Sequence, residues 1–126
     1  IYMAGYTDHD KIPELMNKSD LYVQPSLSEG MPISVIEAMS MKLPVILTKV
    51  GGMPELIKNK EGGILVNIND KKELYDAILY YIKNPKKIRI DGKRNRDFVK
   101  QNFNWKYHAK KLFNIYQNIK EKSKKI

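Results

Sequence analysis

Four short apolar runs, separated by helical patterns and by glycine or proline turns, constrain the fold of this chain most strongly. They are Ile1–Ala4, Leu21–Val23, Val45–Thr48 and Ile64–Val66. Each run has the length and composition of a buried strand rather than a helix. Short helices are expected between them, at residues 13–18, at residues 33–41 and from Pro54 onward. This alternation predicts βαβ units in an α/β fold, a Rossmann-like parallel sheet with helices on both faces.

The second half of the chain changes from alternation to helices alone. Apolar spacing predicts one helix that ends at Asn84-Pro85, a second over residues 86–102 and a third from about Asn104. We expect the third helix to turn its apolar residues toward a core; they are Ala109, Leu112, Phe113, Tyr116 and Ile119. The predicted organisation is an α/β core over residues 1–68 followed by C-terminal helices over residues 69–126. Because the chain starts inside a strand-like run without Met, we expect it to be part of a longer protein.

Composition and charge exclude several classes of protein. The 126 residues allow a single domain, and the absence of cysteine excludes disulfides, thiolate metal sites and thiol nucleophiles. No apolar run approaches the roughly 20 residues that span a bilayer, so a cytoplasmic location is expected. The formal charge of +9 is uneven: residues 1–63 carry six lysines and eight acidic residues, whereas residues 64–126 carry 17 Lys or Arg and six acidic residues. The basic half therefore raises the possibility of an anionic partner.

Residues 25–39 have the pattern of an anion-binding loop. Gly30 follows a predicted strand and directly precedes a predicted helix with Pro32 at its start. The free N–H groups and the dipole of a helix N-terminus favour a phosphate at this place. Ser34 and Glu37 share one stripe of this otherwise apolar helix. For Glu37 two interpretations remain open: a partner within the protein, such as a backbone N–H or a lysine, and a ligand contact.

The spacing of Glu29 and Glu37 argues against a glycosidase pair. Glycosidase carboxylates lie about 5 to 9.5 Å apart. Glu37 lies about 7.5 Å along the helix axis, and Glu29 precedes the helix by several loop residues, so the two are expected to be farther apart. Such a separation suits the two ends of an extended ligand whose phosphates lie between them. A nucleotide sugar, with ribose, pyrophosphate and hexose, has this shape.

The segment from Glu29-Gly30-Met31-Pro32 to Glu37-Ala38-Met39 resembles the E-x7-E motif of a known family. That family is the retaining glycosyltransferases of family 4, also called glycosyl transferases group 1, and the match is to the C-terminal donor-binding domain of their GT-B fold. The resemblance continues in family order along nearly the whole chain. Its further parts are Gly5, residues 19–26, residues 43–46, Gly51-Gly52 with Glu55, residues 63–66 and Phe103-Asn104-Trp105.

The resemblance implies roles for individual residues. Glu29 would accept hydrogen bonds from the hydroxyls of the donor sugar, and Glu37 from those of the ribose. The pyrophosphate would be held by the residues at the start of the helix: backbone N–H groups of Gly30, Met31 and Ile33, with the Ser34 hydroxyl. Gly5 and Tyr6 would lie near the base. Pro32 replaces the commoner glycine of the family and lacks an N–H.

The resemblance also implies the partners of the protein. The donor would be a substrate such as a UDP- or GDP-hexose, with no cofactor and no metal. The acceptor, a glycan or a lipid, would bind through an N-terminal domain that this chain lacks. The family's Arg and Lys that neutralise the pyrophosphate also lie upstream of the matched segment. This chain alone is therefore expected to bind donor weakly and to transfer no sugar.

Two other hypotheses use the basic half. The first is a basic module that binds phosphate or nucleic acid without catalysis. It is disfavoured because the basic residues near the middle of this half are expected to be spread around their helix rather than on one stripe; they are Lys86, Lys87, Arg89, Lys93, Arg94, Arg96 and Lys100. No nucleic acid partner is therefore expected. The second is a peripheral association of the enzyme with the inner face of an anionic membrane.

Two small motifs complete the predictions. Asp8-His9-Asp10 resembles a D-x-D metal motif, but its place before a helix favours capping by Asp8 or Asp10. Gly51-Gly52 has two equal interpretations, either a simple turn or a backbone approach to the donor sugar.

Overall fold

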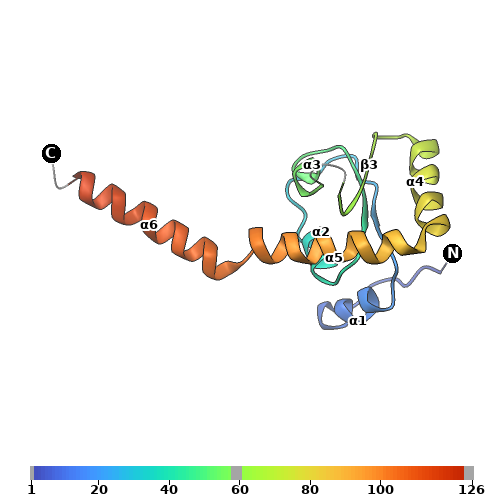
Figure 1. The fold of residues 1–126 in the computed structure, drawn as a ribbon, viewed down its shortest axis with the longest axis horizontal. Coiled ribbons are helices and arrows are strands. Elements are labelled where there is room, and N and C mark those ends of the chain that lie inside the picture. The colour runs from blue at the N-terminus through green and yellow to red at the C-terminus, as the bar shows by residue number, and fades with distance from the viewer. Residues whose placement is uncertain (1, 58–60, 124–126) are drawn as a thin grey trace.

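The computed structural model describes residues 2–57 and 61–123 as a small α/β body with one long helix extending from it (Figure 1). The first elements are a short 3-10 helix η1 (His9–Lys11), α1 (Ile12–Asn17), β1 (Tyr22–Gln24) and α2 (Ile33–Ser40). They are followed by β2 (Val45–Thr48), α3 (Met53–Leu56) and β3 (Gly63–Val66). Three helices complete the chain: α4 (Lys71–Lys83), α5 (Pro85–Asn102) and α6 (Trp105–Ser123). The predicted order of strands and helices is confirmed from residue 12 onward.

The strands form a parallel sheet in the order β1-β2-β3. The central strand β2 is buried on both faces, as its unbroken apolar run predicts. Val45 and Leu47 face α2 and α3, whereas Ile46 faces α4. Helices therefore cover both faces of the sheet, as predicted, because alternate side chains of a strand point to opposite sides.

The predicted first strand is absent. Residue 1 lies outside the described residues, and residues 2–4 form no strand. The side chains of Tyr2 and Met3 are 89% and 86% exposed. A strand needs a neighbour to pair its backbone groups, and β1, the edge strand on this side, has no second partner among the described residues. The apolar run alone therefore does not make a strand here.

Helix α5 crosses the body (Figure 1) and is held by small and polar residues. Gly92 lies so close to the backbone carbonyl of Lys42 that a Cβ on it would stand 1.9 Å from that oxygen. The Asn95 amide donates hydrogen bonds to the carbonyls of Leu43 (2.7 Å) and Gly62 (2.6 Å). Asn95 thereby ties α5 to the two loops that lead into β2 and β3.

A buried carboxylate joins α5 to α4. Asp91 accepts a hydrogen bond from the Tyr81 hydroxyl at 2.9 Å, and it lies 3.5 Å from the Lys87 ammonium and 3.8 Å from the Arg94 guanidinium. Arg94 also pairs with Glu61 at 3.5 Å. Burial, and the hydrogen bond to Asp91, raise the pKa of the Tyr81 hydroxyl far above its usual range. Two cations and a hydroxyl therefore surround this buried side chain, and such partners offset the cost of burying a carboxylate.

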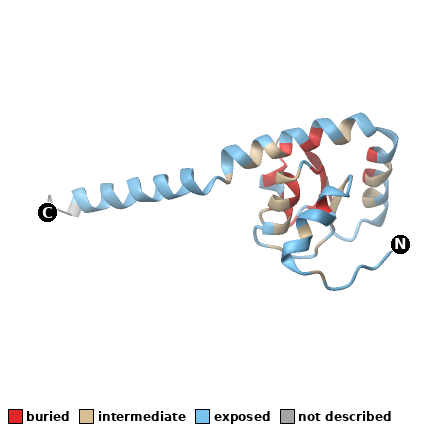
Figure 2. Cartoon of the chain, turned by 90° about the horizontal axis from the view of Figure 1, so that it is seen from below, coloured by how far each residue is buried: buried red, intermediate tan, exposed pale blue. Residues whose placement is uncertain are grey.

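Helix α6 projects away from the body, and its residues 105–122 are all exposed (Figure 2). The expectation that its apolar residues face a core is wrong for the structure: Leu112, Phe113, Tyr116 and Ile119 are about half exposed or more. Trp105, at its start, is 88% exposed. No part of the described chain lies over this helix. None of the helices in the described ranges has the length and apolarity to cross a membrane.

Candidate functional site

The loop between β1 and α2 lies at the carboxyl end of the parallel sheet, as its motif predicts. β1 ends at Gln24, Pro25 stops it, and α2 begins at Ile33. The sequence places Pro32 at the start of the helix, and in the structure it is the N-cap residue, with φ −72° and ψ 120°. The side chain of Pro32 offers no capping acceptor, so the first amides of α2 stay available to an external anion.

Glu29 is fixed by two neutral side chains. Its Oε1 accepts hydrogen bonds of 2.6 Å from Gln24 Nε2 and from Ser26 Oγ. The bond from Ser26, followed by the bond from Gln24, holds the pKa of the Glu29 carboxyl below its usual range. Both bonds end on the same oxygen, and in the described ranges no hydrogen bond reaches Oε2. The carboxylate is therefore ionised and oriented, with one oxygen left to accept a hydrogen bond from a ligand.

Gln24 is a residue of the site that the motif did not reveal. Its Oε1 accepts hydrogen bonds from the Tyr22 hydroxyl (2.9 Å) and the Ser34 hydroxyl (3.1 Å). Gln24 thus connects Glu29 in the loop with Ser34 in the first turn of α2. The available signal was its place as the last residue of β1, at the edge of the sheet where ligands bind.

The Gly51-Gly52 turn packs against the loop between β1 and α2. The Gly52 N–H donates to the carbonyl of Gly30 at 2.7 Å, and Gly51 has a φ of +51°. A Cβ on Gly51 would stand 1.9 Å from the carbonyl oxygen of Glu29. The Thr48 hydroxyl donates to the carbonyl of Ser26 at 2.6 Å. The glycine pair therefore turns the chain and also lets the backbone reach the loop that carries Glu29.

Glu37 lies one turn farther along α2 from Ser34 and remains accessible, with its side chain 38% exposed. Its Oε1 is 3.7 Å from His9 Nε2. Glu37 therefore has a partner within the protein, but this partner is His9 and not the lysine or backbone N–H that was expected. Glu37 and His9 line a small cavity of about 100 Å³ between α1 and α2. Glu29 and Glu37 thus lie in different surroundings, one on the loop and one beside α1.

Gly5 and Tyr6 belong to an irregular segment before η1. Gly5 has a φ of +69°, and the Tyr6 side chain is 92% exposed. Within the described residues no hydrogen bond joins either of them to Glu29 or Glu37. His9 of η1, three residues after Tyr6, lies 3.7 Å from Glu37 of α2. Their proposed place near a base stays a prediction.

The Asp8-His9-Asp10 motif does not cap a helix with a side chain. Asp8 is the N-cap residue of η1 without a capping hydrogen bond, and its carboxylate pairs instead with Lys11 at 3.5 Å. The capping prediction is wrong because Lys11, one turn later, competes for this carboxylate. In residues 2–57 and 61–123 no three His, Asp or Glu side chains gather as metal ligands. Glu55 lies in the first turn of α3.

This geometry agrees with comparisons to known proteins. The family model described as "Glycosyl transferases group 1" matches residues 1–105. The chain belongs to the glycosyl transferases group 1 family. Its structure is also similar to that of sucrose-phosphate synthase from Thermosynechococcus elongatus, with a TM-score of 0.85 and 30% identity over 94% of this chain and 30% of that one. The predicted GT-B C-terminal domain fold is thus confirmed.

Two further relatives bear on the ligand. HepE of Anabaena, solved with UDP, has a TM-score of 0.70 and 27% identity over 91% of this chain and 30% of its own. The UDP-Gal:alpha-D-GlcNAc-diphosphoundecaprenol alpha-1,3-galactosyltransferase of Escherichia coli is 33% identical over 105 residues, 83% of this chain and 27% of that enzyme. This group 1 chain therefore spans about a third or less of the length of these relatives.

Proposed function

We propose that this chain is the donor-binding part of a retaining glycosyltransferase, which transfers a hexose from a nucleotide-diphosphate sugar to a glycan or lipid acceptor. The observation that carries the proposal is the Glu29 carboxylate, ionised and held by Gln24 and Ser26 next to the uncapped N-terminus of α2. A carboxylate for hydroxyl groups and a helix N-terminus for phosphates are the two kinds of group that a nucleotide sugar requires. Membership of the family and the UDP bound to HepE support the proposal.

In this proposal each side chain binds one part of the donor. The free Oε2 of Glu29 accepts hydrogen bonds from the hydroxyls of the sugar, and Glu37 accepts them from the ribose. The pyrophosphate lies between them, against the N–H groups of Gly30, Met31 and Ile33. Ser34 is oriented by Gln24 at the same place. Gly5 and Tyr6 lie toward the base.

The contribution of this chain to the reaction is electrostatic. Opening of the anomeric bond gives the sugar an oxocarbenium-like charge and leaves a negative charge on the departing diphosphate. The backbone amides at the start of α2 stabilise that negative charge without reorganisation, because the helix already fixes their direction. Glu29 keeps the hexose in place while the bond to the diphosphate breaks.

The acceptor and the location of the enzyme belong to the same proposal. The name of the E. coli relative specifies a diphosphoundecaprenol-linked acceptor, which favours a lipid-linked acceptor here. An enzyme with such an acceptor works at a membrane surface, so we propose a peripheral association with the membrane. The acceptor binds to the part of the protein outside this chain, and this chain alone transfers no sugar.

The test replaces each carboxylate in the protein that carries this chain. Glu29→Gln should lower kcat/KM for sugar transfer about 100-fold, because a charge-assisted hydrogen bond contributes about 1.5 to 3 kcal/mol. Glu37→Gln should weaken donor binding by a similar factor. Glu14→Gln is the matched control, since Glu14 lies on the exposed side of α1 and pairs with Lys18 at 2.6 Å. Ordinary activity in both the Glu29 and Glu37 variants would refute the proposal.

A further inference from the structure

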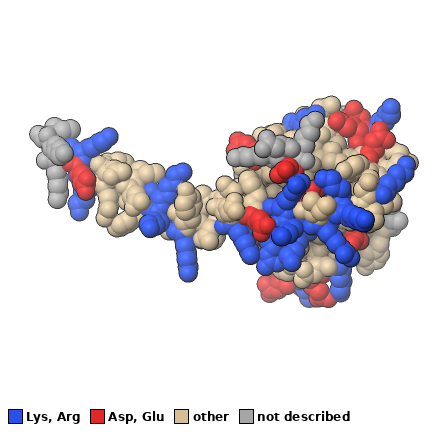
Figure 3. All heavy atoms as spheres, viewed as in Figure 1, with Lys and Arg blue, Asp and Glu red and all other residues tan. Residues whose placement is uncertain are grey.

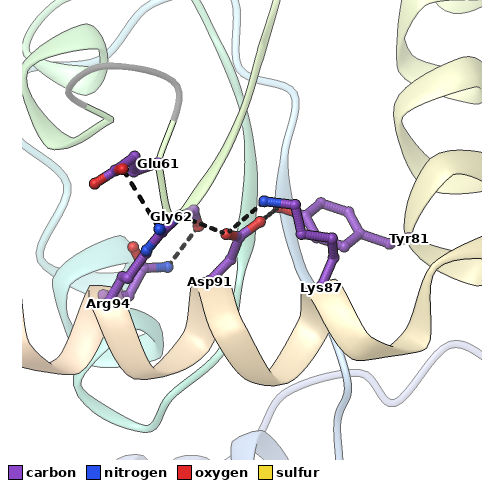
Figure 4. Close-up of polar contacts among 7 residues, drawn as sticks. Glu61, Gly62, Tyr81, Lys87, Asp91 and Arg94 are labelled. Carbon is purple, nitrogen blue, oxygen red and sulfur yellow. Dashed lines mark hydrogen bonds and ion pairs between the residues drawn. The ribbon is translucent and has the colours of Figure 1, made fainter.

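The basic residues of α5 lie on two faces of the helix. Lys87 and Arg94 turn to Asp91 and Glu61 (Figure 4). Four others follow at spacings of four, three and four residues, which place them along one side of a helix. These are Arg89, Lys93, Arg96 and Lys100. One face therefore neutralises acidic residues, and the other collects cations.

The second face forms a groove with a fifth cation. A cavity of about 560 Å³ is lined by Lys42, Arg89, Lys93, Arg96 and Lys100, with Ile88 and Asp97. We call this set the cationic groove. Figure 3 shows Lys and Arg side chains gathered on the face of α5 that is turned to the viewer. Its four helical cations extend for about 16 Å, since eleven residues separate the first from the last.

The groove is a built feature rather than a chance group of lysines. Lys42 lies in a turn after α2 with a φ of +65°, and its carbonyl is in contact with Gly92. The absence of a side chain at Gly92 therefore brings Lys42 next to α5. Within the described residues, no ion pair of 4.0 Å or less joins any of the five cations to a carboxylate. Five like charges held together are unfavourable unless an anion neutralises them.

We propose that the cationic groove docks on the phosphate headgroups of an anionic lipid bilayer. Clustered Lys and Arg side chains bind such a surface by charge, and an exposed row of them can contact several headgroups at once. Nucleic acid fits less well, because the groove contains no aromatic residue on which a base could stack and no amide side chain that could read a base. The choice of lipid also rests on the proposed function, in which the acceptor is lipid-linked.

The groove is separate from the residues that would bind the donor. None of its lining residues belongs to the Glu29 loop or to the first turn of α2. Substitutions in the cationic groove should therefore weaken membrane docking without changing donor binding. In this arrangement α5 holds the domain at the membrane surface, where a lipid-linked acceptor is found.

The experiment is sedimentation of the protein that carries this chain with vesicles. One set of vesicles contains 30% phosphatidylglycerol in phosphatidylcholine and the other contains phosphatidylcholine alone. The groove variant is Arg89→Gln/Lys93→Gln/Lys100→Gln, which changes exposed residues only. The matched control, Lys106→Gln/Lys110→Gln/Lys111→Gln, removes the same charge from exposed positions of α6. Melting temperatures show whether each variant is folded.

We expect binding to anionic vesicles at low salt, little binding to neutral ones, and at least a tenfold loss in the groove variant. The control should change by less than twofold. Equal binding to both vesicles, an unchanged groove variant, or an equal loss in the control would overturn the proposal. So would tighter binding of a 20-base-pair duplex than of vesicles at the same salt. Nucleotide-sugar binding should be the same in the groove variant and the wild type; its absence in both would refute the proposed function and not the groove.

Discussion

The two long C-terminal helices are both basic, yet only one belongs to the folded body. Helix α6 carries more large apolar residues than α5 and is exposed over residues 105–122, whereas α5 packs across α2 and buries Asp91, Gly92 and Asn95. A close backbone approach and hydrogen bonds to loop carbonyls hold α5 in place. The comparison teaches that an apolar stripe alone does not dock a helix. The helix also needs a surface whose shape and polar groups match it.

The largest effect should come from filling the contact between α5 and the turn after α2. Gly92→Val places carbon atoms where the carbonyl oxygen of Lys42 now lies, so α5 must move away from the body. We expect the 126-residue chain to lose about 3 kcal/mol or more of its free energy of unfolding in urea. The control Ala109→Val, in exposed α6, should cost about 0.5 kcal/mol. A Gly92 variant as stable as this control would contradict the role of the contact.

Removal of the Asn95 amide should have the next largest effect. Asn95→Ala leaves the buried carbonyl of Leu43 without its donor, whereas the carbonyl of Gly62 keeps the hydrogen bond from the Val45 N–H at 3.2 Å. An unsatisfied buried acceptor costs about 1 to 3 kcal/mol, so we expect a loss of about 2 to 3 kcal/mol by urea denaturation. Asn118→Ala in α6 is the exposed counterpart and should change stability by less than 0.5 kcal/mol. Similar losses of stability in both variants would contradict the claim that α5 is held in the body and α6 is not.

The hydrogen bond between Tyr81 and Asp91 should make stability depend on alkaline pH. Below the ordinary tyrosine pKa of about 10, both the folded and the unfolded chain keep the phenol proton, so the full stability is present. Above it the unfolded chain releases a proton that folded Tyr81 retains, so stability falls as the pH rises. Tyr81→Phe should cost about 1 kcal/mol at pH 8 and should flatten this alkaline fall. An equally steep fall in the variant, measured by urea unfolding between pH 8 and 11, would show that other groups cause it.

The smallest effect should come from the apolar residues of α6. Leu112→Gln should change the free energy of unfolding of the 126-residue chain by less than 0.5 kcal/mol, because the side chain is already half exposed. Leu56→Gln in α3, where the leucine is buried, should cost more than 2 kcal/mol in the same assay. A loss above 1 kcal/mol for the Leu112 variant would show that α6 packs in solution.

Much of the fold could be predicted from the sequence because strands and helices depend on local patterns. The run Val45–Thr48 is β2 without a change of bounds, and the strand, loop and helix around Glu29 lie where the motif places them. The error at residues 2–4 has a different origin, since a strand also depends on a neighbour that local sequence does not contain. The same holds for α6, whose apolar spacing shows a face without showing what covers it.

The residues of the site that lie within one sequence motif could be predicted. Contacts between residues far apart in the sequence could not. Glu29 and Ser34 are connected through Gln24, ten residues before Ser34, and no motif marked that glutamine. His9 meets Glu37 across two helices, which spacing along the chain could not show. Two cations of α5 pair with Asp91, whose burial is a property of the fold that spacing along the chain does not show.

Calorimetric titration of UDP- and GDP-hexoses, and of the free diphosphates, into the protein that carries this chain tests the central claim most directly. The account predicts that at least one nucleotide sugar binds. Glu29→Gln should weaken binding of the nucleotide sugar at least tenfold and binding of its free diphosphate less than twofold, because in the proposal Glu29 contacts only the hexose. Glu37→Gln should weaken both, because both contain the ribose. If no nucleotide sugar binds, or if both variants bind like the wild type, the assignment of a donor site to the Glu29 loop and α2 is contradicted.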